Sequence, residues 1–167
     1  MKVFGCAVVL LWVATVSAGP LHSWSKILPE PRFQFVMNDE AVFDRETGLV
    51  WEQSPGTTSL DYPDDYSAGI GPIFTCYNKV VGGRKGWRLP TVEELASLID
   101  PAESSPALPN GHPFSHVQNA YYLSILNGDH EEGNKFYRVS FDTGAVQQNL
   151  SSGQYLWCVR GGHGGTW

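Results

Sequence analysis

Positive charge is scarce in this 167-residue sequence, which carries 11 Lys and Arg against 17 Asp and Glu, a formal net charge of −6. Nucleic acids and anionic membranes are bound largely through clusters of Lys and Arg. The charge balance therefore argues against a nucleic-acid partner. Charged residues of both signs make up only 17% of the chain and hydrophobic residues 42%, which argues against intrinsic disorder.

The sequence also lacks internal repeats, low-complexity blocks and any collagen-like Gly-X-Y stretch. Its length suits one ordinary domain with a core. Aromatic residues reach 13%, beside 18 Gly and 11 Pro. This composition favours a loop-rich fold with short strands over a helical bundle.

Long apolar runs are absent except for one at the N-terminus. Lys2 precedes an almost wholly apolar stretch from Val3 to Val16, and small residues follow as far as Ala18. The pattern predicts a signal peptide over residues 1–18, with cleavage after Ala18. The alternative is a retained anchor, but the run is short for a bilayer span. We expect an exported chain with no membrane insertion after cleavage.

Cysteine is scarce as well, with three in the whole chain. Cys6 falls within the predicted signal peptide, so Cys76 and Cys158 alone remain in the mature chain. Two cysteines in an exported protein most often form one disulfide. A reactive thiol pair or a metal site is the alternative, although no His lies beside either Cys at ligand spacing.

The clearest local signal lies at residues 86–95. Trp87 and Leu89 alternate with a polar residue as in a short strand, and Pro90 then disfavours a helix immediately before it. Thr91 fits the N-cap of a helix, with Glu94 three residues on, which predicts a capping box. The helix is expected to end at residues 100–101, with one face formed by Val92, Leu95, Ala96 and Ile99.

Other segments carry weaker patterns. Residues 33–43 read as one extended run, which turns at residues 44–48 and returns as a strand over 49–52. A first helix is expected from Pro72 to Gly82, and further strands over residues 120–125, 136–141, 145–146 and 155–160. Residues 19–32 are interpreted as a flexible lead-in and residues 162–167 as a Gly-rich tail. The shared face of the first helix would comprise Ile73, Cys76, Tyr77 and Val80.

The polar loops over residues 54–71, 101–119 and 127–134 are the candidate binding surface, because loops on a rigid scaffold usually carry recognition. Their acids and histidines could also be ordinary solvated side chains, and Pro113 argues against a helical zinc site between the two histidines. We predict no metal and no cofactor. Asn149 would be glycosylated only in a host that modifies such sites. The candidate loop residues are Asp61, Asp64, Asp65, His112, His116, Asp129 and Glu131.

Large apolar side chains are interpreted as core rather than as a ligand platform. Arg88 and Arg160 are expected to bind backbone carbonyls or acids near the sheet, the alternative being contact with a glycan. No nucleophile–base pair occurs at a recognisable spacing. The predicted core residues are Trp51, Trp87, Leu89, Leu95 and Trp157.

Several pieces, taken in order, resemble the Lcl C-terminal domain family, the C-terminal domain of the Legionella collagen-like adhesin. The pieces are Val42-Phe43-Asp44 with Thr47-Gly48-Leu49-Val50-Trp51, then Gly86-Trp87-Arg88-Leu89-Pro90-Thr91-Val92-Glu93-Glu94-Leu95, then Cys158-Val159-Arg160. Tyr121-Tyr122-Leu123-Ser124 lies where the family often has a Tyr-Trp-Ser-Ser strand. The resemblance covers residues 33–161.

The resemblance implies an α+β, C-type-lectin-like fold, with two helices flanking a small twisted antiparallel sheet. In that fold one disulfide commonly joins the first helix to the final strand, which would pair Cys76 with Cys158. Members are typically exported bacterial proteins. Resemblance to the adhesin that names the family implies binding of sulfated glycans. The acidic charge of this chain argues against such a ligand, and the missing collagen-like stalk argues against trimerisation.

Two hypotheses on function follow. The first is an exported, non-catalytic binding or adhesion module in the periplasm or at the cell surface, recognising a glycan or a surface protein. The second is an enzyme of the formylglycine-generating type, or a degenerate relative, which would share the Arg-Leu-Pro-Thr piece. That chemistry uses a close cysteine pair and copper, so a thiol count on unreduced protein separates the two.

Overall fold

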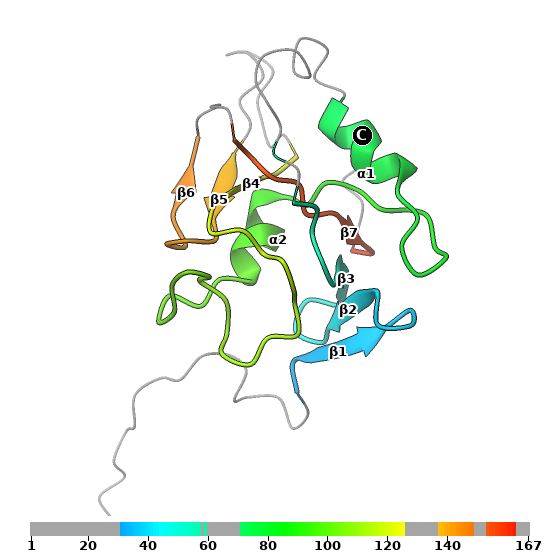
Figure 1. The fold of residues 1–167 in the computed structure, drawn as a ribbon, viewed down its shortest axis with the longest axis horizontal. Helices are drawn as coiled ribbons and strands as arrows, with labels where there is room; N and C mark the ends of the chain where they lie inside the picture. The colour runs from blue at the N-terminus through cyan, green and yellow to red at the C-terminus, as the bar shows by residue number, and fades with distance from the viewer. Residues whose placement is uncertain (1–30, 58, 60–70, 126–136, 149–152, 163–167) are drawn as a thin grey trace, which may run out of the picture.

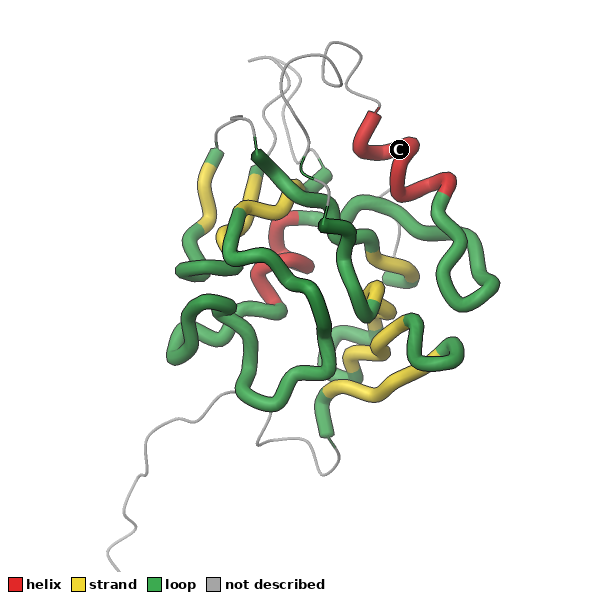
Figure 2. Tube along the Cα trace, viewed as in Figure 1, coloured by secondary structure: helices red, strands yellow, loops and turns green. Residues whose placement is uncertain are grey.

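The structure is a computed structural model that describes residues 31–57, 59, 71–125, 137–148 and 153–162. It is an α+β arrangement of two antiparallel sheets, two short helices and one disulfide (Figure 1). The elements in order are β1 (Phe33–Val36), β2 (Ala41–Asp44), β3 (Leu49–Glu52), α1 (Gly71–Asn78), α2 (Val92–Ser97), β4 (Tyr121–Leu123), β5 (Arg138–Ser140), β6 (Val146–Gln147) and β7 (Val159–Arg160). Figure 2 shows that loops and turns make up most of the described chain, as the Gly and Pro content predicts.

The strands form two sheets, whereas the family resemblance implied a single sheet. The first has the order β1-β2-β3-β7, and the second has the order β4-β5-β6. In the first sheet, β7 pairs with β3 through Val50 opposite Arg160 and Trp51 opposite Val159. The end of the described chain is thereby fixed to the N-terminal hairpin, with β1 at the outer edge of the sheet.

The predicted extended run over residues 33–43 is wrong, because the chain reverses in its middle. Met37, Asn38 and Asp39 have φ values of 53°, 56° and 64°. Three consecutive left-handed residues fold β1 back onto β2 as an antiparallel pair. Asn and Asp tolerate this conformation better than most residues and favour turns. The Asn-Asp pair was therefore a turn signal within an apparent strand.

The first helix is shorter than predicted, since α1 ends at Asn78 rather than at Gly82. Cys76 is fully buried and Ile73 packs against the same buried cluster, but Tyr77 and Val80 are 66% and 55% exposed, so only part of the predicted face points inward. Residues 81–84 instead form a tight turn closed by hydrogen bonds between Val81 and Arg84. This turn lies between the end of α1 and Trp87.

The core is built around Trp157. The rings of Trp51, Phe114, Tyr122 and Phe141 lie with centroids 4.9 to 5.7 Å from that of Trp157. Its indole N–H also donates to the Glu52 carbonyl at 2.9 Å. All five predicted core residues are at most 1% exposed.

A second buried cluster surrounds the disulfide, which joins Cys76 of α1 to Cys158 with a Cα–Cα distance of 5.5 Å. Cys158 directly precedes β7, so the bond connects the first helix to the start of the final strand, as the sequence predicts. Trp87 and Leu89 pack in the same cluster. The disulfide therefore belongs to the core and is not a surface clasp.

Several sequence predictions fall on residues outside those that the structure describes: the signal peptide 1–18, most of the lead-in 19–32, and most of the tail 162–167. Pro31 and Arg32 are the described residues of the lead-in, and Arg32 is buried and ion-paired with Asp44 rather than part of a flexible segment. Within the described ranges, no helix has the length and apolar character that a membrane crossing requires. Asp61, Asp64, Asp65, Asp129, Glu131 and Asn149 also lie outside the described residues.

Candidate functional site

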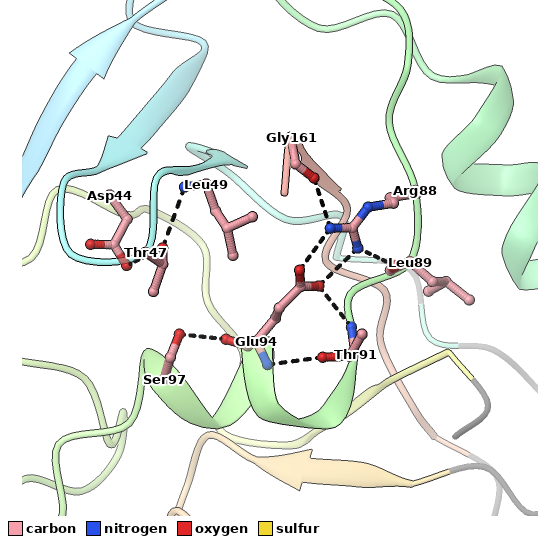
Figure 3. A network of polar contacts seen from close by, with 9 residues as sticks. All are labelled: Asp44, Thr47, Leu49, Arg88, Leu89, Thr91, Glu94, Ser97 and Gly161. Atoms are coloured by element: carbon pink, nitrogen blue, oxygen red, sulfur yellow. Dashed lines mark hydrogen bonds and ion pairs between the residues drawn. The ribbon is translucent and has the colours of Figure 1, made fainter. Parts of the chain in front are cut away.

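The residues of the 86–95 stretch form a scaffold network (Figure 3). The guanidinium of Arg88 donates to both carboxylate oxygens of Glu94 at 2.7 and 2.8 Å and to the Gly161 carbonyl at 2.8 Å. Glu94 also accepts from the backbone N–H of Thr91 at 2.9 Å, and the Thr91 hydroxyl accepts from the Glu94 N–H at 3.2 Å. The two bonds between Thr91 and Glu94 are the predicted capping box. Arg88 connects this box to Gly161, the residue after β7.

Arg160 has a similar role, because its Nε donates to the Lys85 carbonyl at 3.0 Å. Both arginines thus bind backbone carbonyls, and Arg88 also binds an acid. Both terminal nitrogens of Arg88 are engaged with the scaffold, so Arg88 is a poor candidate for contact with a ligand.

We expect Glu94→Gln to lower the free energy of unfolding by about 1–2 kcal/mol, because a charge-assisted, two-point interaction with Arg88 is lost. Gln can still serve the capping box at this position. Thr91→Ala removes the cap instead, at about 1 kcal/mol. Urea unfolding followed by tryptophan fluorescence measures both. An unchanged unfolding midpoint in Glu94→Gln would show that the Arg88 ion pair contributes nothing.

A half-open groove between β1 and the loop 109–113 is the candidate binding site among the described residues. Its volume is about 370 Å³. Phe35 contributes an aromatic ring that is 47% exposed. The groove is lined by Pro31, Arg32, Phe33, Phe35, Pro109, Asn110, Gly111, His112 and Pro113.

The loop wall of the groove is a tight turn. The N–H of His112 donates to the Pro109 carbonyl at 3.0 Å, and Gly111 has a φ of 78°. A positive φ at the third position is characteristic of a type II turn and favours glycine there. Asn110 occupies the second position and is an exposed residue that lines the groove.

Gly111→Ala is expected to cost about 1–2 kcal/mol of stability, because a Cβ is strained at positive φ. A Cβ built at Gly111 meets nothing within 4 Å, so the cost is conformational rather than steric. Gly56→Ala is the matched control, since its Cβ also meets nothing within 4 Å and no positive φ occurs there. Equal unfolding midpoints for the two variants would contradict the turn assignment.

His112 is held in place by the core. Its ring stacks on Phe114 with centroids 6.0 Å apart, and Phe114 contacts Phe33 at 5.1 Å and Trp157 at 4.9 Å. Burial lowers the pKa of His112, and a backbone hydrogen bond at Phe114 only partly opposes this. The imidazole is therefore neutral at pH 7. Both walls of the groove rest on the same aromatic cluster.

Arg32, the one cation that lines the groove, is already engaged. It donates to the Asp44 carboxylate at 2.9 and 2.8 Å and to the Ser97 carbonyl at 2.8 Å. It also lies 2.9 Å from the Glu46 carboxylate. Two acids therefore neutralise this guanidinium.

His116 does not join His112 in one site. Its Nδ1 lies 3.1 Å from the hydroxyls of both Ser54 and Ser115. A serine nucleophile needs the opposite ring nitrogen oriented by a carboxylate, together with oxyanion donors. Here the hydroxyls of Ser54 and Ser115 both lie within hydrogen-bond distance of Nδ1 of His116. The arrangement suits a structural hydrogen-bond network better than hydrolysis.

That network fastens the loop wall to the end of β3. Gln53 Nε2 donates to the Pro113 carbonyl at 2.9 Å, and the Ser115 N–H donates to the Gln53 carbonyl at 2.9 Å. The partners are about sixty residues apart in the chain, so sequence reasoning could not associate them. Among the described residues, no group of three or more His, Cys, Asp or Glu is placed to hold a metal ion.

Sequence reasoning placed only His112 of the groove residues among its candidates. Asn110 lies in the predicted binding loop 101–119 but was not singled out, and Phe35 was missed because an alternating Phe reads as part of a strand. Only the approach of β1 to the loop 109–113 identifies them.

The model of the Lcl C-terminal domain family matches residues 40–160 of this chain. No curated protein and no solved structure gives a significant match. The matched segment makes up most of the chain. It contains α1, α2, the disulfide and the ion pair between Arg88 and Glu94. The chain belongs to the Lcl C-terminal domain family.

Proposed function

We propose that this protein is an exported, non-catalytic binding or adhesion module that recognises a glycan or a surface protein through the groove between β1 and the loop 109–113. The observation that carries the proposal is the construction of the groove. An exposed Phe35 and the polar Asn110 and His112 face a cavity whose two walls rest on one aromatic cluster. Preformed concave sites with few polar groups are typical of ligand binding.

Export is supported by the buried disulfide, because such bonds persist in oxidising compartments. The apolar N-terminal run agrees with it, and we propose that residues 1–18 are removed as a signal peptide. The mature protein would then act in the periplasm or at the cell surface. The finer architecture that we propose is C-type-lectin-like, on the strength of the family and of the bond between first helix and final strand.

The enzyme of the formylglycine-generating type is the less favoured alternative. Its chemistry needs two accessible thiols, whereas Cys76 and Cys158 are bonded to each other and fully buried. A thiol titration of unreduced, unfolded mature protein should find none free. Two free thiols would restore the enzyme hypothesis.

The proposed function is tested with the mature chain, residues 19–167, on a glycan array and on a panel of purified surface and matrix proteins. We expect at least one ligand, with binding weakened about tenfold or more by Phe35→Ser. Phe74→Ser is the matched control, because Phe74 is 53% exposed and lies on α1, which Figure 1 shows at the opposite end of the molecule from β1. Failure to bind on both panels would contradict the proposal.

A further inference from the structure

We propose, on the basis of the function proposed above, that the groove takes an uncharged saccharide, with one face of a sugar ring packed against Phe35 and its hydroxyls bonded by Asn110 and His112. The groove, the exposed ring and the two polar side chains are the observations that carry this. The inference names the ligand class and the residues that select it.

The charges around the groove disfavour an anionic ligand. Sulfate and carboxylate groups are recognised by guanidinium or ammonium groups that have free donors. Arg32 lines the groove, but Asp44, Glu46 and the Ser97 carbonyl engage its Nε and Nη2. An anion in the groove would therefore find beside it a guanidinium whose charge two acids already neutralise.

Shape and apolar surface favour a ring with a hydrophobic face. Phe35, Pro109 and Pro113 all line the cavity, whose volume of about 370 Å³ is of the size that holds a small ligand. A sugar ring exposes C–H groups on one face and hydroxyls around its rim. Such a molecule can cover Phe35 while it stays solvated at the open side.

The polar side chains favour hydroxyls over a Pro-rich peptide. The side-chain amide of Asn110 offers both a donor and an acceptor. Nδ1 of His112 is buried without a hydrogen-bond partner in the described part of the chain, so Nε2 is the ring nitrogen that remains for a ligand. Burial lowers the pKa of His112 and keeps the imidazole neutral at pH 7. A hydroxyl can satisfy both kinds of group. A polyproline segment carries no backbone N–H at its prolines, so the acceptors of Asn110 and His112 would be desolvated without a partner.

The test is an NMR titration of ¹⁵N-labelled mature protein with its disulfide intact. The probes are a panel of neutral hexose tetrasaccharides, a heparin-derived sulfated tetrasaccharide and a proline-rich decapeptide. We expect a neutral tetrasaccharide to shift the amides of Phe33, Phe35, Gly111 and His112. Phe35→Ser should weaken its Kd about tenfold or more and His112→Ala about threefold or more, while Phe74→Ser leaves the Kd unchanged.

Three results would overturn the inference. Saccharide shifts confined to residues outside the groove would overturn this site, here and in the proposed function, and would leave only a binding module with its site elsewhere. Binding of the sulfated probe or the peptide in preference to every neutral sugar would overturn the ligand class. If none of the probes binds while the arrays detect another ligand, the inference fails alone; if the arrays detect none either, the proposed function fails with it.

Discussion

Loss of the Cys76–Cys158 disulfide is expected to lower the free energy of unfolding by about 4–5 kcal/mol, before any strain is considered. The two cysteines are 82 positions apart, and an open chain of that length has a large loop-closure entropy to lose on folding. Domains of this size are stable by only about 5–15 kcal/mol in total. The reduced protein should therefore be marginally folded.

Loss of the disulfide should lower local stability most at α1. Apart from the disulfide, the described ties between the α1 region and the sheet include an ion pair between Lys79 and the buried Glu52, with N and O 2.5 Å apart. Glu52 also accepts from the N–H of Cys158 at 2.9 Å, so the ion pair and the disulfide support the same junction. Hydrogen exchange of α1 should accelerate most on reduction.

Guanidinium unfolding with and without reductant measures this effect. The double variant Cys76→Ala/Cys158→Ala should match the reduced wild type, which separates loss of the bond from side reactions of free thiols. A difference below about 1 kcal/mol would mean that the unfolded chain is already compact, so that the bond removes little entropy.

Trp157→Ala should destabilise the protein by about 3–5 kcal/mol, the range for truncating a buried large aromatic. Trp157 is fully buried, four other aromatic rings contact it, and its N–H bonds the Glu52 carbonyl. The substitution leaves a cavity and a carbonyl without that donor. Trp157→Phe should cost less, because it keeps most of the ring volume.

The same substitution should affect the groove. Phe114 packs on Trp157 at 4.9 Å and on both Phe33 and His112, so its support extends to each groove wall. Urea unfolding gives the stability loss, and hydrogen exchange at Phe33 and His112 reports on the groove. Phe74→Ala, at an exposed ring, is the control and should change neither. An effect of Trp157→Ala no larger than that of the control would contradict the packing described here.

The residues that carry the family resemblance and those that line the groove are different sets. Asp44 binds Arg32, Glu94 binds Arg88, and Trp51 and Trp157 fill the core. Phe35 precedes the matched segment, which begins at residue 40, and the loop 109–113 lies outside the pieces that mark the family. Family membership therefore specifies the scaffold, while the groove can differ among members, so that ligand cannot be inferred from family alone.

The sequence by itself determined the features that depend on neighbouring residues or on few choices. A capping box joins residues three apart, so Thr91 and Glu94 identified the start of α2. The turn at residues 44–48 and the strand that follows it also depend on neighbouring residues, so the sequence predicted them. The two cysteines left after the predicted cleavage site allowed only one pairing within the chain, which the structure contains.

Only the tertiary structure decided how those pieces meet. Periodicity shows that a face is apolar but not what covers it, so the exposed Tyr77 and Val80 were read as part of an inward face. The family resemblance implied one sheet, whereas the strands pair as two. The reversal between β1 and β2 was hidden in an apolar run. The groove exists because β1 and residues 109–113, some 75 positions apart, rest on one aromatic cluster, and no local pattern records a contact of that range.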